Sequence, residues 1–433
     1  MTNTTALEEL LEGSINTGLD AIKRAPIVAH ETEVRCLRIQ DISNSKPFTE
    51  WGFTETKDTD YEKYRLRTDD IIMARTCSTG ICYLVKNDMS AVFNNGLARV
   101  RVDKNRVDPS FLYYIFKSKQ FEKYIDGISG GTSVQLNMKV GDLARFELRL
   151  PDLSDQKAIA HILGTLDDKI ELNQKMNQTL EEIAKAIFKS WFVDFDPVRT
   201  KAERRPTGLP PEISDLFPDE LVDSEIGEIP KGWEVTPLQG CAIEIESGRR
   251  PKGGIDKSLR QGIPSVGAES IAPAGEFDFS KVKYVTAEFA EKMKKGRVQN
   301  FDVALYKDGG KPGQFIPRVG IYGDAFPFDH FYVNEHVFLL RSEQLGQPFL
   351  YRLVSSPAFL YQLIAKGSAK AAQPGLNQTE VVESTFVRPN EDAITVFNNK
   401  TRPLLERQFL LGKENEILSD LRDTLLPKLI SGN

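Results

Sequence analysis

The chain has 433 residues, of which 40% are hydrophobic and 27% charged, and its net charge is −6 at pH 7. This length allows about three domains of ordinary size, each able to bury its own core. No apolar run approaches the roughly 18–20 residues of a membrane-spanning helix and the polar N-terminus lacks a signal-peptide pattern, so we expect a cytoplasmic protein.

The charge is distributed unevenly along the chain. Residues 151–230 carry 9 basic and 17 acidic side chains, whereas residues 249–318 carry 14 basic and 8 acidic ones. A basic segment rich in glycine is typical of phosphate contact, although it can also be an ordinary solvated surface. The four cysteines have no paired metal-ligand spacing, so we expect reduced thiols and no metal site; they are Cys36, Cys77, Cys82 and Cys241.

Residues 1–150 are predicted to form a mixed α/β domain. Pro109 opens an amphipathic helix over Phe111–Ile125, and Phe146–Leu150 is expected to be the last strand. Four earlier β-type runs alternate with turn residues: Val34–Ile39, Asp70–Ala74, Ile81–Val85 and Leu97–Val102.

Residues 151–192 are predicted to form a long helix, for which Asp152 or Ser154 supplies the N-cap. Its apolar positions step alternately by four and three residues, which is a coiled-coil heptad. The aromatic side chains at its end, Phe188, Trp191 and Phe192, exceed what one seam can bury, so we expect them in a protein interface.

The remainder of the chain is predicted to repeat this organisation. Residues 193–232 form a linker rich in proline and charge, 233–388 a second globular domain with a helix from Phe349 to about Ile364, and 389–433 a second helical region. The expected seam residues of the two helices are Leu166, Ile170, Asn177, Leu180, Ile187, Leu404, Leu411, Asn415, Leu418 and Leu425. Two matched seams on one chain favour an antiparallel pair, in which Asn177 and Asn415 would fix the register.

An internal repeat of about 238 residues supports this organisation. Phe111-Leu112-Tyr113 reappears as Phe349-Leu350-Tyr351, and Pro151 matches Pro389 at the same offset. A period of this length indicates a duplicated domain rather than a solenoid. The predicted fold class is therefore α+β: two mixed α/β domains separated by an antiparallel pair of long coiled-coil helices.

Catalytic motifs are not apparent. Gly309-Gly310-Lys311 does not satisfy the P-loop pattern, because Tyr306 and Pro312 occupy positions where that pattern requires glycine and Ser or Thr. We also find no glycine-rich dinucleotide motif and no Ser/His/Asp arrangement. The sequence therefore favours a recognition protein without catalytic residues.

Two segments resemble a known family. The stretch from Leu150-Pro-Asp-Leu-Ser-Asp-Gln-Lys to Trp191-Phe-Val-Asp-Phe-Asp-Pro-Val198 resembles the central helical region of the specificity (S) subunits of type I restriction-modification enzymes. Ser224-Glu-Ile-Gly-Glu-Ile-Pro-Lys-Gly-Trp233 is similar to the entry of their second target-recognition domain. This resemblance covers almost the whole chain.

The resemblance implies a non-catalytic subunit with several partners. Each target-recognition domain would bind one half of a bipartite double-stranded DNA target, and the chain would bind two methyltransferase subunits and a restriction or translocase subunit. S-adenosylmethionine, ATP and magnesium would belong to those partners. Inserting four residues within 166–187 and 404–425 would lengthen the helix pair by about 6 Å and the target spacer by one or two base pairs.

Polar loops are the candidate DNA-binding segments, because arginine and lysine pair with guanine, and asparagine and glutamine with adenine. Each loop could also be an ordinary surface turn. The candidates are Arg75, Thr76, Ser78, Thr79, Thr132 and Gln135 in the first domain, and Ser247, Arg249, Arg250, Lys252, Lys307, Lys311, Lys370 and Gln373 in the second.

Two alternative functions fit the same sequence. A bipartite DNA-binding regulator would use the same surfaces without a methyltransferase, and a scaffold protein would use the helix pair to bind other proteins. Copurification with a methyltransferase distinguishes the three. The sequence does not give the DNA target, because loop chemistry does not translate directly into bases.

Overall fold

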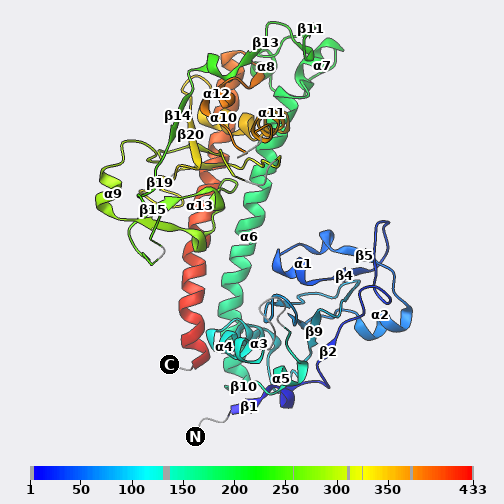
Figure 1. Cartoon of the computed structure of the whole chain (residues 1–433). Coiled ribbons are helices and arrows are strands. Elements are labelled where there is room, and N and C mark those ends of the chain that lie inside the picture. The colour runs from blue at the N-terminus through cyan, green and yellow to red at the C-terminus, as the bar shows by residue number, and fades with distance from the viewer. Residues whose placement is uncertain are drawn as a thin grey trace. The chain divides into compact units, whose positions relative to one another are not determined.

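The computed structural model describes residues 4–129, 137–256, 258–309, 313–323, 325–370 and 374–431. Two compact units are present: unit 1 is Met1–Lys169 with Leu418–Asn433, and unit 2 is Ile170–Ile417. The long helices α6 (Leu153–Phe192) and α13 (Glu391–Ser431) contribute residues to both units (Figure 1). No helix in the described part of the chain is long and apolar enough to cross a membrane.

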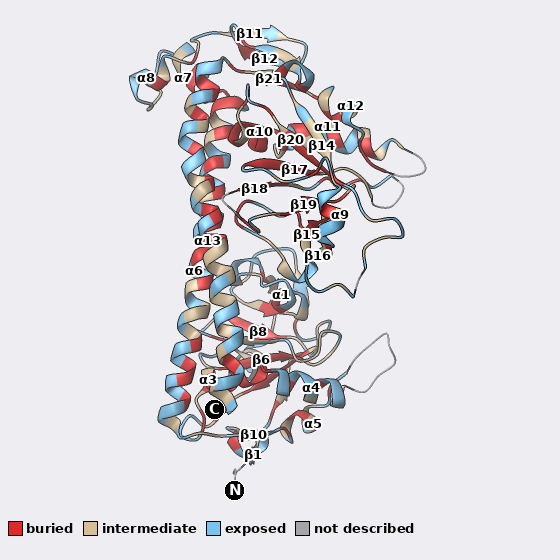
Figure 2. Ribbon diagram, turned by 90° about the vertical axis from the view of Figure 1, so that its left-hand side faces the viewer, coloured by how far each residue is buried: buried red, intermediate tan, exposed pale blue. Residues whose placement is uncertain are grey.

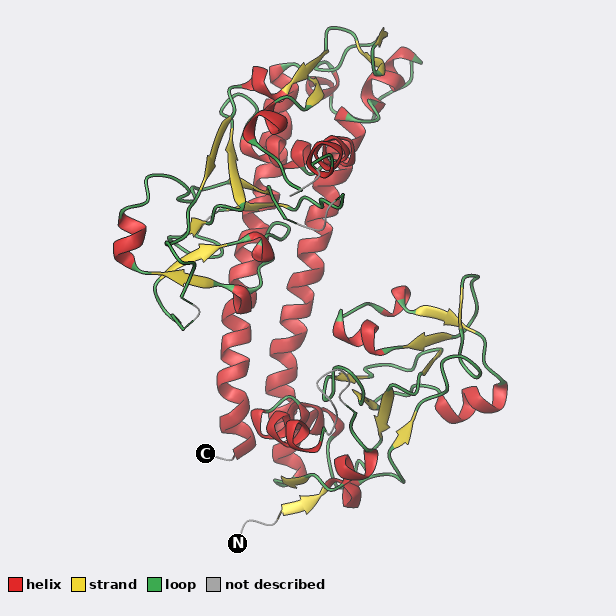
Figure 3. Cartoon of the chain, viewed as in Figure 1, coloured by secondary structure: helices red, strands yellow, loops and turns green. Residues whose placement is uncertain are grey.

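Unit 1 contains a mixed α/β domain built on two four-stranded sheets (Figure 3). The first sheet has the order β2 (Asn16–Thr17), β9 (Leu97–Val100), β6 (Ile71–Ala74) and β7 (Cys82–Leu84). The second has the order β3 (Ile27–Val28), β5 (Gly52–Thr54), β4 (Arg35–Leu37) and β8 (Ala91–Phe93). The four β-type runs expected from the sequence thus correspond to β4, β6, β7 and β9.

Short elements complete this domain. Strand β1 (Thr4–Ala6) pairs with β10 (Glu147–Arg149), which lies within the expected last strand. The remaining helical turns are η1 (Leu7–Leu10), α1 (Ile39–Ser43), η2 (Phe48–Glu50), α2 (Asp58–Tyr64) and α5 (Val140–Ala144).

The predicted single helix over Phe111–Ile125 is wrong, because two helices occupy this region. They are α3 (Pro109–Phe116) and α4 (Lys119–Ile128). Ser118 lies between them in an extended conformation, and its hydroxyl accepts a hydrogen bond of 3.2 Å from the backbone N–H of Phe121. A serine that caps a new helix in this way ends the preceding one.

The second predicted helix is divided for the same reason. The segment expected to run from Phe349 to Ile364 consists of α10 (Gln347–Val354) and α11 (Pro357–Ser368), and Ser356 caps α11. Pro357 strengthens the break, because proline is well tolerated in the first turn of a helix but not in its interior.

Unit 2 contains the second mixed domain. Its main sheet has the order β14 (Glu244–Ser247), β20 (Val337–Arg341), β17 (Asp302–Tyr306) and β18 (Val319–Tyr322). A three-stranded sheet has the order β16 (Lys283–Val285), β15 (Ile263–Val266) and β19 (Tyr332–Val333). The remaining elements are β13 (Glu234–Pro237), paired with β21 (Thr385–Arg388), and η3 (Leu238–Cys241), η4 (Ala268–Ser270), η5 (Phe279–Lys281), α9 (Ala287–Glu291) and α12 (Gln378–Val382).

The two domains share one topology, as the internal repeat predicts. Their main sheets match strand for strand, β2-β9-β6-β7 with β14-β20-β17-β18, and the parallel pair β4·β8 matches β15·β19. A buried aspartate at one end of the central strand binds an arginine side chain through two nitrogens in each domain. The pairs are Asp70 with Arg101 and Asp302 with Arg341, at 2.6–2.8 Å.

The long helices pack antiparallel within each unit. In unit 2, Asn173 Nδ2 donates to Glu414 Oε2 at 3.0 Å, and Gln408 Nε2 donates to the carbonyl oxygen of Asn177 at 3.2 Å. In unit 1, Arg422 Nη1 lies 2.8 Å from Asp167 Oδ1. Residue numbers thus rise along α6 as they fall along α13. The predicted fold class, two mixed domains with an antiparallel pair of long helices, is confirmed.

The expected seam positions alternate with exposed ones along both helices (Figure 2). Ile170, Asn177 and Leu411 are buried. The other expected seam residues are half-buried: Leu166, Leu180, Ile187, Leu404, Asn415, Leu418 and Leu425. The side-chain N–H of Asn177 contacts the carbonyl oxygen of Gly275 at 3.3 Å, so this asparagine also binds a loop of the second domain.

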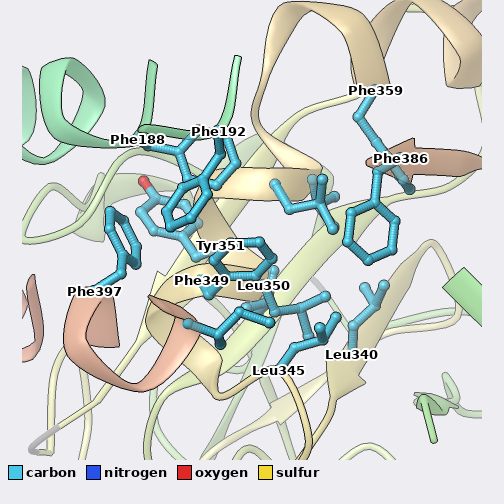
Figure 4. Packing of buried hydrophobic residues seen from close by; sticks show 14 of the residues in the cluster. Phe188, Phe192, Leu340, Leu345, Phe349, Leu350, Tyr351, Phe359, Phe386 and Phe397 are labelled. Carbon is cyan, nitrogen blue, oxygen red and sulfur yellow. The ribbon is translucent and has the colours of Figure 1, made fainter. Parts of the chain in front are cut away.

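The aromatic residues at the end of α6 are not an exposed interface, which corrects the expectation from the heptad. Phe188, Trp191 and Phe192 are each about 5–6% exposed and belong to the main core of unit 2. Figure 4 shows Phe188 and Phe192 against Phe349 of α10 and Phe397 of α13. The heptad pattern could not reveal this burial, because the residues that bury these side chains lie more than 150 positions away in the sequence.

The segment 193–232, expected to be a linker, contains folded elements. These are α7 (Asp196–Ala202), α8 (Pro211–Ser214) and a hairpin of β11 (Leu221–Ser224) and β12 (Gly227–Pro230). Phe195, Val198 and Phe217 are buried in the main core of unit 2. The segment is therefore packed against the second domain at these side chains.

Candidate nucleic-acid interface

Arg75 lies just beyond β6, where several segments of the first domain converge. Its guanidinium donates to the carbonyl oxygen of Asn95 at 3.2 Å, to Asn137 Oδ1 at 3.3 Å and to the carbonyl oxygen of Met138 at 3.5 Å. All three acceptors are uncharged. Arg75 is half-buried and held in place, as a residue that contacts DNA should be.

The other first-domain candidates follow Arg75 along the loop. Thr76 forms a backbone bridge with Asn137, and Thr79 Oγ1 lies 3.2 Å from Ser129 Oγ. Ser78 is half-buried. The candidates Thr132 and Gln135 lie outside the described residues.

The equivalent place in the second domain is occupied by Lys307, just beyond β17. The backbone carbonyl of Lys307 accepts from the N–H of Leu376, and the neighbouring Asp308 bridges Gly375. Lys370 Nζ donates to the carbonyl oxygen of Gly375 at 2.8 Å, so these contacts bring Lys307 and Lys370 together. The candidates Lys311 and Gln373 lie outside the described residues.

Ser247 and Arg250 approach the same region from β14. Ser247 Oγ donates to the backbone carbonyl of Glu335 at 3.3 Å, and Arg250 Nε lies 2.7 Å from Glu335 Oε1. Arg249 and Lys252 are exposed. The four candidates of this loop therefore lie on a surface next to the turn that contains Glu335.

A second group of basic residues lies near this loop. Pro251 and Lys292 line one surface pocket, and the backbone of Gly296 packs against that of Gly248. The exposed basic side chains of this group are Lys292, Lys294, Lys295 and Arg297. The two basic segments that are separate in the sequence thus meet in the fold, which suits contact with a polyanion.

Several residues of this interface were missed by the sequence analysis. They are Asn95, Asn137, Glu335 and His336. His336 Nδ1 contacts Asp308 Oδ1, and His336 Nε2 lies 3.3 Å from Glu335 Oε1. The 238-residue repeat could have identified one of them, because Asn137 matches Gly375 at that offset and both form the equivalent bridge.

Two glycines allow backbone segments of this region to approach each other closely. A Cβ atom on Gly18, next to β2, would overlap the backbone carbonyl oxygens of Phe93 and Asn94. Gly248, which follows β14, occupies the equivalent position against the carbonyl of Val333. No other residue type fits here without displacing the backbone that follows β8 or β19.

Replacing Gly18 by alanine should therefore destabilise unit 1 by about 1–3 kcal/mol through overpacking. Gly141→Ala is a matched control in the same unit, because its added Cβ meets open space and alanine favours the helix in which it lies. Denaturant unfolding, followed by the fluorescence of Trp51, measures the stability of both variants. Trp51 is buried in unit 1. Equal midpoints for the two variants would contradict the packing argument.

Comparison with known proteins finds similar specificity subunits. Residues 37–182 match the model of the type I restriction modification DNA specificity domain. The chain is 27% identical over 368 residues to the MjaIX type I restriction enzyme specificity subunit of Methanocaldococcus jannaschii, covering 84% of this chain and 77% of that protein. It is 26% identical over 438 residues to the HindI specificity subunit of Haemophilus influenzae, covering 90% and 92%.

A solved structure shares the fold. The S subunit of a type I restriction-modification system from M. genitalium covers 99% of this chain with a TM-score of 0.59 at 16% identity, and 96% of its own length is matched. That likeness concerns the arrangement of the backbone. The matching domain and the two relatives along most of its length make the chain similar to the specificity subunits of type I restriction-modification enzymes.

Proposed function

We propose that this chain binds a bipartite double-stranded DNA target and contacts one half of it with each mixed domain. The observation that carries this proposal is the shared topology of the domains, which brings Arg75 and Lys307 to equivalent positions beyond β6 and β17. Both lie among polar loops whose sequences differ. Two domains with the same backbone arrangement but different loops can make similar contacts with two different DNA sequences.

The chain would serve as a non-catalytic subunit of a larger complex. In this proposal it carries two methyltransferase subunits and a restriction or translocase subunit, which would bind S-adenosylmethionine, ATP and magnesium. The cytoplasm, where the DNA and these partners would be, is the proposed location.

The helix pair of unit 2 offers a surface for a methyltransferase subunit. Leu172, Met176 and Ile183 lie on one face of α6, and they are 56%, 42% and 43% exposed. On α13, Leu410 and Ile417 are 52% and 66% exposed. Apolar side chains at helical spacing on a solvent-exposed face are typical of a site where a partner helix packs.

Sequencing of methylated DNA tests the proposal. Cells that express the chain with a methyltransferase should methylate a target of two separated half-sites, and cells without the chain should not. Copurification of the methyltransferase distinguishes this function from the alternatives. A regulator would bind DNA without it, and a scaffold would show no sequence preference.

Combined replacement of Arg250 and Lys252 by alanine is expected to weaken DNA binding. If one of these side chains lies against a phosphate, the slope of log K against log salt becomes shallower by about 0.9, and by about twice that if both do. Binding titrations at several salt concentrations measure this slope. An unchanged slope would remove both residues from the phosphate contacts.

A further inference from the structure

One turn occurs in both domains with the same geometry. In the first domain, the N–H of Leu97 donates to the carbonyl of Asn94 at 3.0 Å, and in the second the N–H of Val337 donates to the carbonyl of Asn334 at 3.4 Å. The turns connect β8 to β9 and β19 to β20. We call them the first and second connecting turns, 94–97 and 334–337.

The same backbone contacts hold both turns in place. The N–H of Arg75 donates to the carbonyl of Gly96, and the N–H of Lys307 donates to the carbonyl of His336, both at 3.0 Å. Each turn is thus fixed next to the basic residue that follows the central strand. The backbone hydrogen bonds that hold the turn are the same in both domains, and the two turns differ in their side chains.

The second connecting turn carries a charged network. Glu335 Oε1 lies 2.7 Å from Arg250 Nε and 3.3 Å from His336 Nε2, and His336 in turn contacts Asp308. The backbone carbonyl of Glu335 also accepts from Ser247. Ser247 thus binds the backbone of Glu335, and the Glu335 carboxylate forms an ion pair with the guanidinium of Arg250, whose side chain is 59% exposed.

The ion pair with Glu335 makes Arg250 less suited to a phosphate than to a base. The Glu335 carboxylate at 2.7 Å offsets part of the positive potential of the guanidinium and would itself repel a nearby phosphate. An ion-paired arginine is suited to a neutral base edge, and its two terminal nitrogens match guanine O6 and N7. For Lys252, in contrast, the described residues provide no ion pair.

We propose that Arg250 contacts a guanine in the half-site bound by the second domain, and that Glu335 is the positioning residue that orients it. This inference rests on the proposed function and names a specificity determinant within it. The first connecting turn has Asn95 in place of Glu335, and the hydrogen-bond acceptors of its neighbour Arg75 among the described residues are uncharged. The two domains therefore differ in side-chain chemistry at a shared backbone position.

Single variants of the full chain, expressed with its methyltransferase, test this assignment. Arg250→Ala and Glu335→Ala should each reduce the preference for guanine by about 5- to 150-fold at the same single position of one half-site. The other half-site and the spacer should stay unchanged. Lys252→Ala is the matched control, and it should weaken binding to all sequences equally and leave the motif intact.

Glu335→Gln separates the charge of Glu335 from its size, because the amide keeps the shape of the side chain and removes its negative charge. We expect this variant to lose less of the guanine preference than Glu335→Ala. Methylated-DNA sequencing and selection of bound duplexes from a randomised library give the readout. An unchanged motif in Arg250→Ala, or equal weakening at all sequences, would overturn the assignment. Absence of a bipartite motif with the wild-type chain would instead reject the proposed function.

Discussion

Replacing Arg352 by alanine is expected to destabilise unit 2 by about 3–5 kcal/mol, because the buried carboxylate of Glu181 loses its buried partner and keeps Lys185, whose side chain is 58% exposed. Arg352 of α10 and Glu181 of α6 are 3% and 8% exposed, and two hydrogen bonds of 2.6 and 2.8 Å join them. The guanidinium also lies 3.9 Å from the ring centre of Tyr351. This ion pair connects the second domain to the long helix.

Tryptophan fluorescence during urea unfolding can localise the effect. Trp191 and Trp233 are buried in unit 2 and Trp51 is buried in unit 1, so variants that keep only one set of tryptophans report on each unit separately. The loss should appear in the signal from Trp191 and Trp233. A loss of equal size in the Trp51 signal would contradict a local role.

Two further variants separate the ion pair from other effects. The double variant Arg352→Met with Glu181→Leu should lose less stability than Arg352→Ala, because it leaves no unpaired buried charge. Glu171→Ala removes an exposed pair with Lys175 on the same helix, whose side chains are 47% and 69% exposed, and should cost less than about 1 kcal/mol.

The pH dependence of this pair follows from the shift at Glu181. Burial raises the pKa of Glu181, but Arg352 and Lys185 together lower it by more, so the folded pKa lies below the ordinary value of 4.5. A group with a depressed pKa stabilises the fold above its unfolded pKa and loses this contribution as the pH falls through the folded value. The stability difference between the wild type and Glu181→Gln should therefore be largest above about pH 4.5 and shrink in stronger acid.

The long helices were predictable because their signal is local. A heptad that runs from Leu166 to Trp191 depends only on residues three and four apart, so it needs no knowledge of the rest of the fold. The break at Ser118 is equally local, but the aromatic spacing on both sides concealed it.

The candidate interface was only partly predictable because its contacts are not local. The bond from Arg75 to Asn137 joins residues 62 positions apart, and that from Ser247 to Glu335 joins residues 88 apart. Composition identified the basic loops correctly as polar and glycine-rich. It could not show that Glu335 pairs with Arg250, because this depends on how the loop after β14 and the second connecting turn meet.

The burial of Phe188 and Phe192 has a consequence for the partner surface. Aromatic residues at a helix end indicate burial, but the sequence does not say whether residues of the same chain or of a partner chain bury them. In unit 2, Phe349 and Phe397 of the same chain pack against them. A methyltransferase subunit would therefore need another surface, and the exposed face with Leu172 and Met176 is the one we propose.

Insertion of one complete heptad into both long helices is expected to lengthen the spacer of the DNA target by about three base pairs. Seven residues add about 10.5 Å of helix, and DNA rises about 3.4 Å per base pair. The insertions belong between Lys169 and Ile170 and between Ile417 and Leu418, where the two units divide, so that contacts within each unit are kept. A complete heptad also preserves the phase of the apolar seam.

Shorter and one-sided insertions are the controls for this prediction. Four residues in both helices add about 6 Å but shift the seam by a fraction of a turn, so the spacer should grow by one or two base pairs with weaker activity. Seven residues in α6 alone leave the helices unequal in length and should abolish methylation. Sequencing of methylated DNA gives the spacer directly. An unchanged spacer in the two-helix heptad variant would show that the length of the helix pair does not set the distance between the half-sites.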